Sequence, residues 1–271
     1  MNLRKYLIKL YSRIFARTYF YNFNVLLYNM SIRGLGVYSH KSGEYFFYRN
    51  LLPNILKNSK PVIFDVGANI GSKTLLFKKL FPQSRIYSFE PNPKCFEKLR
   101  VINQENIKLF PLALGIKKEK IKLYDRESPG TTKHSSLYKE VITECHHSEF
   151  VEFDVHVETL DTICKQEGIE YIDFIKIDTE GNDFFVLQGA KELLSKGGIK
   201  CIQFEFNIMN TVSRIFFRDF IQLLKGYRLY RMLPNGIVKL NSNITHTEIY
   251  GLQNVVAILE ENKVSSAKSE P

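Results

Sequence analysis

Buried-strand patterns and helical patterns alternate along the chain from residue 61 onward. Short β-branched or aromatic runs predict strands, and segments with a helical apolar period lie between them. Such alternation favours a parallel sheet with helices on both faces. The predicted strands are 61–65, 85–89, 107–110, 172–177, 200–206, 227–232 and 254–259, and the predicted helices lie near 70–81, 93–104, 159–167, 182–195 and 212–225.

These elements place an α/β domain at residues 61–260. Residues 1–60 are basic and rich in Tyr and Phe, and they predict a partly helical N-terminal extension or cap. The polar residues 261–271 predict a disordered tail. The chain is therefore expected to have one main domain with an appendage at its front.

One segment interrupts the alternation inside the domain. Residues 115–156 predict an irregular insertion, with strand-like pieces at 119–124 and 150–156. Farther along, the Pro-Asn-Gly sequence at 234–236 predicts a turn between two late strands.

The net charge of +10 is concentrated at the front of the chain. Residues 1–60 carry ten Lys or Arg and one acid, Glu44, which gives +9 and leaves +1 for the other 211 residues. A nucleic-acid enzyme more often carries basic charge on its active-site face, so nucleic acid is not the expected partner. Four cysteines without a C-x-x-C pair, and no apolar run of about 18 residues, fit a cytoplasmic location.

The first 20 residues predict an amphipathic helix. Lys5, Lys9, Arg13 and Arg17 form a basic stripe, and apolar side chains fall largely on the opposite side. Charges interrupt the apolar residues, so the segment lacks the apolar core of a secretory signal. Two interpretations stay open. The helix packs on the main domain or on a second subunit, or it lies on an anionic membrane at the inner face.

Residues 62–71, VIFDVGANIG, predict a strand, a glycine turn and a helix start, as at many nucleotide sites. A P-loop is excluded because Val66 stands where a glycine is required. A dinucleotide is disfavoured because a carboxylate would face its pyrophosphate. S-Adenosylmethionine instead presents an ammonium and a sulfonium, which a carboxylate attracts. We therefore expect an S-adenosylmethionine site at Asp65, Gly67, Ala68, Asn69 and Gly71.

A second acid supports this assignment. Glu90 ends the run IYSF, nineteen residues beyond Gly71, and Pro91 follows it. An acid at the end of the second strand is placed to accept both ribose hydroxyls of a nucleoside. NAD shares the ribose, but the pair of Asp65 and Glu90 favours S-adenosylmethionine. Glu90 and Pro91 are therefore added to the expected cofactor site.

Five motifs follow one another in order: VIFDVGANIG, SFEPNP, FPLALG, VETLDTI and DFIKIDTEGNDFFVLQGA. Over about residues 60–207 they resemble the FkbM family of methyltransferases, and the last motif is the specific one. The resemblance implies a Rossmann-like, seven-stranded, mostly parallel sheet that binds S-adenosylmethionine. It also implies that Ala113 and Ser136, beside Ser135, lie near the cofactor. The family mostly methylates hydroxyl groups, often on sugars or polyketide-type products.

Carboxylates follow two of the predicted strands. Asp178 and Glu180 come after strand 172–177, and Glu205 lies in strand 200–206. Because parallel sheets bind ligands at the carboxyl ends of their strands, these acids are the candidate catalytic residues, and Asp178 is also assigned to the cofactor site. An alcohol is a poor nucleophile, so Asp178 or Glu180 accepts its proton, or two of the acids hold Mg²⁺. We favour the metal-free interpretation.

The insertion also holds most of the histidines. His134, His146, His147 and His156, with Cys145, are residue types that bind zinc. Their spacing matches no structural zinc motif, and we expect scattered surface histidines instead. No metal ligands are predicted in the protein.

These observations predict an O-methyltransferase that acts on a hydroxyl of a sugar or glycan, which is lipid-linked or part of a surface polysaccharide if the first helix binds membrane. The alternative acceptor is a small natural product or a lipid. A hypothesis of another class is a non-catalytic membrane adaptor with a retained methyltransferase fold. The intact Asp65, Gly67 and Glu90 argue against it, because an idle site need not keep them. A homo-oligomer stays open.

Overall fold

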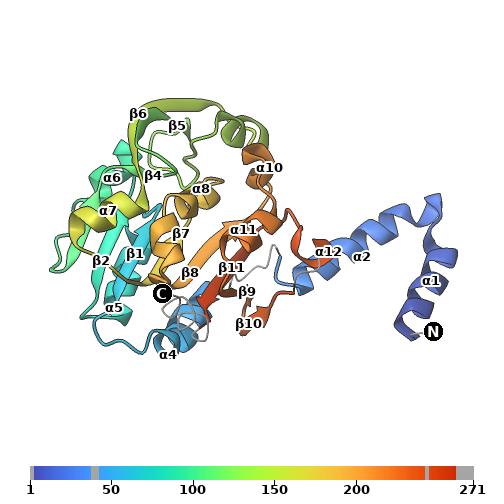
Figure 1. Ribbon diagram of the computed structural model, residues 1–271. Coiled ribbons are helices and arrows are strands. Elements are labelled where there is room, and N and C mark those ends of the chain that lie inside the picture. Colours follow the sequence, from blue (N-terminus) through green and yellow to red (C-terminus); the bar gives the residue numbers. More distant parts are fainter. Residues whose placement is uncertain (1–2, 38–42, 242–243, 261–271) are drawn as a thin grey trace.

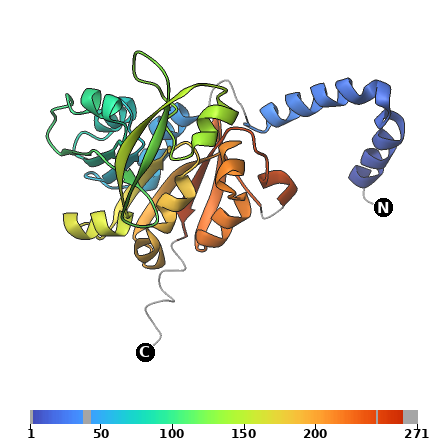
Figure 2. The ribbon, with the colours of Figure 1, turned by 90° about the horizontal axis from the view of Figure 1, so that it is seen from above.

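The computed structural model describes residues 3–37, 43–241 and 244–260 (Figure 1). A central sheet lies between two layers of helices, and a smaller sheet lies at one end of it. Two N-terminal helices project from the body (Figures 1 and 2). The predicted tail at 261–271 lies outside the described residues.

The central sheet has eight strands in the order β10-β9-β11-β8-β7-β1-β2-β3. Neighbouring strands from β8 to β3 are parallel, and β11, β9 and β10 pair antiparallel. The strands of this sheet are β1 (Val62–Val66), β2 (Arg85–Phe89), β3 (Ile107–Phe110), β7 (Ile172–Ile177), β8 (Ile199–Phe206), β9 (Tyr227–Leu233), β10 (Gly236–Lys239) and β11 (Gln253–Leu259).

All seven predicted strands are present, but the predicted count of seven is corrected to eight. The extra strand, β10, forms a hairpin with β9, in which Gly236 pairs with Leu233 across the predicted turn. β10 is a half-buried to exposed edge strand. Because its side chains are not buried, it lacks the apolar run that reveals the other strands.

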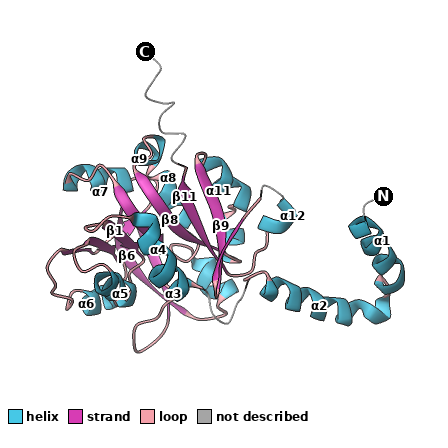
Figure 3. Cartoon of the chain, turned by 90° about the horizontal axis from the view of Figure 1, so that it is seen from below, coloured by secondary structure: helices cyan, strands magenta, loops and turns pink. Residues whose placement is uncertain are grey.

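Helices cover both faces of the sheet (Figure 3). The helical segments are α1 (Leu3–Phe15), η1 (Thr18–Phe20), α2 (Tyr21–Gly34), α3 (Glu44–Phe46), η2 (Phe47–Leu51), α4 (Leu52–Leu56), α5 (Ser72–Leu80), α6 (Pro93–Leu99), η3 (Val141–Cys145), α7 (Leu160–Glu167), α8 (Asp183–Gln188), α9 (Lys191–Ser195), α10 (Met209–Ser213), α11 (Phe217–Leu223) and α12 (Ile244–Thr247).

Two apolar cores separate the sheet from its helices. On one face, residues of α7, α8, α9 and α11 pack together, and Phe204 stacks on Phe220 with ring centroids 4.3 Å apart. On the other face, η2, α4 and α5 pack on the sheet around Phe47, Phe77 and Phe174. Every residue of β1 and β7 is buried, because both of their faces are covered.

Two of the predicted helices are broken into shorter ones. The segment predicted at 182–195 divides into α8 and α9 around Gly189, where a Cβ would lie 2.1 Å from the carbonyl oxygen of Gly115. The segment predicted at 212–225 divides at Arg214, whose backbone is left-handed with φ 57°. A helical period reveals neither the close approach at Gly189 nor the left-handed angle at Arg214.

The predicted insertion supplies two strands, β5 and most of β6, of a separate three-stranded sheet in the order β4-β6-β5, and β4 lies directly before it. The strands of this sheet are β4 (Ala113–Leu114), β5 (Glu119–Arg126) and β6 (Phe150–Glu158). The two strand-like pieces predicted there pair with each other antiparallel, with Glu119 opposite Val157 and Arg126 opposite Phe150. The insertion is thus an ordered layer at the end of the domain.

The N-terminal arm, which we define as α1, η1 and α2, projects from the body (Figures 1–3). α1 buries no residue. Phe15 packs on Phe20 and Phe23 at the corner, where Asn24 donates a hydrogen bond to the Phe15 carbonyl oxygen over 2.9 Å. Within the described ranges, every helix is too short or too polar to cross a bilayer.

Candidate active site

A cavity of about 260 Å³ opens beside the carboxyl ends of β1, β2 and β7. This is the sheet edge at which open parallel sheets bind ligands. Of the predicted site residues, those that line the cavity are Gly67, Ala68, Asn69, Glu90, Pro91, Ala113, Asp178 and Glu180. The predicted site residues outside the lining are Asp65, Gly71, Ser136 and Glu205.

The glycine turn after β1 brings three strands together. The amides of Gly67 and Ala68 both donate to the carbonyl oxygen of Phe89 in β2. Gly67 has φ 79°, and a Cβ there would lie 1.9 Å from the Asp178 carbonyl oxygen. Only glycine permits both the backbone angle and this approach. Gly71 has a different role, because it faces the side chains of Leu99 and Ile102 in the neighbouring helical region.

Glu90 is held at the end of β2 by two backbone hydrogen bonds. Its Oε2 accepts from the Asn69 amide over 2.7 Å, and its Oε1 accepts from the Asn92 amide over 2.8 Å. Burial raises the pKa of this carboxyl to about 7, although both amides oppose the shift. Each carboxylate oxygen retains acceptor capacity, so Glu90 can still bind hydroxyl groups in the cavity.

Asp65 lies beneath the glycine turn rather than in the cavity wall. It is 1% exposed, and its Oδ2 accepts from the Thr74 hydroxyl over 2.7 Å. Its Oδ1 has no hydrogen-bond partner among the described residues. Burial raises its pKa, and the Lys176 ammonium opposes this. Direct contact between Asp65 and a ligand stays a prediction.

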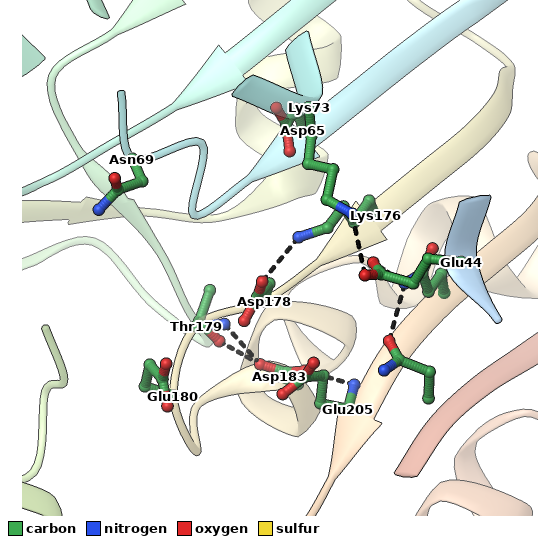
Figure 4. Close-up of polar contacts among 12 residues, drawn as sticks. Glu44, Asp65, Asn69, Lys73, Lys176, Asp178, Thr179, Glu180, Asp183 and Glu205 are labelled. Atoms are coloured by element: carbon green, nitrogen blue, oxygen red, sulfur yellow. Dashed lines mark hydrogen bonds and ion pairs between the residues drawn. The ribbon is translucent and has the colours of Figure 1, made fainter. Parts of the chain in front are cut away.

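Sequence reasoning missed the lysines of the cavity wall. The Lys176 ammonium donates to Asp178 over 2.8 Å, and that of Lys73 donates to Glu44 over 2.9 Å (Figure 4). Burial disfavours the charge of Lys176, but Asp178, Asp65 and Glu44 around it raise the pKa of its ammonium. Lys176 is inside a buried strand and Glu44 is distant in sequence, so only the fold brings them together.

The three candidate catalytic acids come from two adjacent strand ends. Asp178 and Glu180 line the cavity, and Glu205 lies beyond them at the end of β8 (Figure 4). Burial raises the pKa of Glu180 to about 7. Burial, together with Asp178 and Glu180, raises the pKa of Glu205 well above its usual range. Of the three, Asp178 and Glu180 are the ones placed to touch a ligand.

Asp183 is a further acid that the sequence did not single out. Its Oδ1 accepts from the Thr179 amide and its Oδ2 accepts from the Glu205 amide, each over 2.9 Å. The side chain therefore ties the end of β7 to β8 (Figure 4). An acid in the first turn of a helix is common, so its position gave no signal of this role.

The insertion reaches the site through its serines. Ser135 lines the cavity and accepts a hydrogen bond from the Asn92 side chain over 2.8 Å. Ser136 instead donates to the carbonyl oxygen of Glu180 over 2.7 Å. Glu180 has φ 52°, a left-handed angle that is uncommon for a residue with a side chain. The insertion thus supports the strained turn that carries Glu180.

Two histidines of the insertion lie next to the same turn. The rings of His134 and His146 have centroids 4.4 Å apart, and His134 Nδ1 lies 3.5 Å from Glu180 Oε1. One ligand atom from each of these three residues lies within 4.8 Å of the others. They could hold a metal ion. Spacing in sequence gave no sign of this grouping, because the three residues come from separate segments.

The cavity wall can hold a zwitterion and a ribose. The paired lysines and Asp178 present both signs of charge, and Glu90 presents a hydroxyl-binding carboxylate at the end of β2, two strands away from β7. The orphaned Oδ1 of Asp65 adds an unsatisfied acceptor behind the turn. These features fit the amino-acid and ribose groups of S-adenosylmethionine.

Comparisons with known proteins show which protein family the chain belongs to. The methyltransferase FkbM domain matches residues 65–229. The 2-O-methyltransferase NoeI of Sinorhizobium fredii is 30% identical over 196 residues, which cover 68% of this chain and 79% of that protein. The methyltransferase sdnD of Sordaria araneosa is 30% identical over 164 residues, 49% of this chain and 62% of that protein.

Solved structures give weaker similarities. The FkbM methyltransferase of Methylobacillus flagellatus aligns with a TM-score of 0.44 and 13% identity, over 73% of this chain and 44% of that one. The fibrillarin of Aeropyrum pernix with bound S-adenosylmethionine aligns with a TM-score of 0.41 and 13% identity, over 79% and 74%. The family assignment rests on the domain match and on NoeI. The chain belongs to the FkbM methyltransferase family, and it is an enzyme of the methyltransferase class.

Proposed function

We propose that this protein is an S-adenosylmethionine-dependent O-methyltransferase that methylates a hydroxyl group of a sugar or glycan. The observation that carries the proposal is the pair of carboxylates, Asp178 and Glu180, in a cavity whose other side carries Glu90. The name of the relative NoeI, a 2-O-methyltransferase, supports transfer to oxygen.

The residues of the cavity divide into two groups for cofactor binding. Glu90 accepts the ribose hydroxyls, and the negative charges of Asp178 and Asp65 attract the ammonium electrostatically, which leaves Asp178 Oδ1 free for the acceptor. Lys73 and Lys176 attract the carboxylate of the same amino-acid group. When bound, S-adenosylmethionine supplies a methyl group on a sulfonium, and this methyl group is transferred by in-line displacement.

Asp178 is the proposed general base. Its Oδ2 is held by Lys176, so its orientation is fixed and Oδ1 remains available to accept a proton from the acceptor hydroxyl. The proton would pass to the Asp178 carboxylate as the hydroxyl oxygen bonds to the methyl carbon, while the carbon–sulfur bond breaks and S-adenosylhomocysteine leaves. The Lys176 pair also disfavours the alternative of Mg²⁺ shared by Asp178 and Glu180, because an ammonium already occupies one carboxylate oxygen.

Titration calorimetry with S-adenosylhomocysteine tests the cofactor assignment. We expect one binding event per chain with S-adenosylhomocysteine and none with NADH. Binding of NADH alone would remove the methyltransferase mechanism from this cavity. Turnover is then measured as release of S-adenosylhomocysteine with free sugars, nucleotide sugars and lipid-linked glycans, each beside its deoxy analogue. Turnover confined to apolar natural products or lipids would favour the alternative acceptor class.

We place the acceptor at an anionic membrane surface, to which the N-terminal arm binds peripherally. Residues 3–37 contain six basic residues and no acid. Leu3 is 70% exposed, and Tyr28 and Met30 are about as exposed at 59% and 61%. A basic helix with an uncovered apolar face suits the interface of an anionic bilayer, where each basic residue contributes ~1 kcal/mol. A lipid-linked glycan would then lie within reach of the enzyme.

Vesicle binding by charge variants tests this placement. Replacing Lys5, Lys9 and Arg13 by Gln is expected to weaken binding to phosphatidylglycerol-containing vesicles by about 100-fold, from three charges at ~1 kcal/mol each. The measurement is co-flotation of the full chain with the vesicles. The matched control replaces three exposed lysines of the body by Gln and keeps binding: Lys117, Lys118 and Lys120.

Two outcomes would contradict the membrane assignment. The first is equal binding of both triple variants to anionic vesicles. The second is a dimer in solution that dissociates when residues 1–34 are deleted, without any vesicle binding by the full chain. The second outcome would assign the apolar arm to another copy of this chain.

A further inference from the structure

Three side chains from separate segments meet outside the proposed cofactor contacts. His134 lies in the loop after β5, His146 follows η3, and Glu180 lies in the turn after β7. One nitrogen of each histidine and one oxygen of Glu180 lie within 4.8 Å of one another. Because Glu180 also lines the cavity, the cluster lies at the cavity wall.

The histidine nitrogens in this cluster are poorly satisfied. His134 Nδ1 and His146 Nε2 are shielded from solvent, and neither makes a hydrogen bond in the part of the chain that the structure describes, although His134 Nδ1 is within ion-pair distance of Glu180. Burying an unpaired polar atom costs free energy, and a neutral imidazole nitrogen is a metal ligand. Glu180 Oε1 is 3.5 Å from His134 Nδ1. Two ligands at about 2.0–2.1 Å from one tetrahedral ion lie about 3.3 Å apart, so this separation suits a shared ion.

We propose that His134, His146 and Glu180 bind a divalent transition-metal ion of the zinc type. Two nitrogens and one carboxylate favour zinc over Mg²⁺, which prefers oxygen ligands. Three protein ligands leave a fourth position for water or for an oxygen of another molecule. This proposal goes beyond the function proposed above and does not depend on it.

An ion at this place would fasten the insertion to the central sheet. The two histidines belong to the insertion, and Glu180 belongs to the turn that follows β7. One link at this turn is the hydrogen bond from Ser136 to the Glu180 carbonyl oxygen, and Glu180 has the left-handed angle of φ 52°. Metal ligation would offset the cost of that backbone angle and hold the turn against the insertion.

The test is metal binding by the untagged full chain after dialysis against a chelator. Co²⁺ serves as the spectroscopic probe, and Zn²⁺ competes with it. We expect one Co²⁺ per chain, with the visible absorption of a four-coordinate site, displaced by one equivalent of Zn²⁺. Replacing His134 and His146 together by Ala is expected to reduce the affinity about 100-fold or more.

The matched control is His147→Ala, an exposed histidine directly beside His146. This variant is expected to bind Co²⁺ as the wild type does, and Zn²⁺ should raise the Tm of both but not of the double variant. Circular dichroism shows that the double variant is folded. A wild-type chain that binds no stoichiometric ion, or a double variant that binds it equally well, would overturn the proposal, whatever the outcome for methyl transfer.

Discussion

Replacing Asp178 by Asn is expected to lower kcat by about 10³-fold, within the range that a positioned general base contributes. The amide keeps the shape of the carboxylate but cannot accept the proton of the acceptor hydroxyl. The buried Lys176 loses its ionic partner, so we also expect the affinity for S-adenosylhomocysteine to fall, though by less than tenfold. The measurements are turnover with the first acceptor found and calorimetric titration of the product.

The control for Asp178→Asn is Asp154→Asn. Asp154 also forms an ion pair with a lysine, at 3.2 Å from Lys122, but this pair is on the surface of the small sheet. Removal of this pair should leave kcat unchanged, because exposed ion pairs contribute little to the stability of the fold. If the Asp178→Asn enzyme retained the wild-type kcat, the general base would be a group other than Asp178. If Asp178→Asn lost affinity for S-adenosylhomocysteine by the same factor as kcat, Asp178 would only bind the cofactor and would not be the base.

The elements of the central sheet could be predicted because their burial leaves a simple pattern. β1 and β7 are buried on both faces, so most of their residues are apolar, and the helices between them carry a helical period. β10 was missed since it is an edge strand with exposed side chains. The breaks at Gly189 and Arg214 were missed because they depend on contacts between distant segments and on a left-handed angle.

The residues of the candidate site also fall into two kinds, those that a local motif predicts and those that only the fold brings together. Glu90 could be predicted to lie at the cavity because it stands at a strand end after a glycine turn, and such a local motif is visible in sequence; the role of Asp65 stays a prediction. Lys176 could not be found, because an inward-facing lysine in a buried strand looks like a break in an apolar run. The histidine cluster could not be found either. Its ligands come from three segments, and no spacing rule covers such a set.

Replacing Gly67 by Ala is expected to weaken binding of S-adenosylhomocysteine by at least 100-fold and to lower the Tm markedly. The added Cβ would lie 1.9 Å from the Asp178 carbonyl oxygen, a distance that real Cβ atoms do not show. The turn must therefore move away from the end of β7. That movement stretches the 3.0 Å hydrogen bond from the Asp178 amide to Val66 and shifts the residues on both sides of the cavity.

Gly168→Ala is the control that distinguishes the steric contact at Gly67 from the cost of a left-handed backbone angle alone. Gly168 has φ 65°, close to the φ of 79° at Gly67, but a Cβ there would meet no atom within 4 Å. Its left-handed angle costs about 1–2 kcal/mol in a residue with a side chain, so its Tm should fall by a few degrees while product binding stays at the wild-type level. Titrations of both variants at low temperature, with circular dichroism to confirm folding, make the comparison. If folded Gly67→Ala binds S-adenosylhomocysteine as tightly as Gly168→Ala, the methyl donor does not depend on the approach of this turn to β7, and its site must lie elsewhere in the cavity.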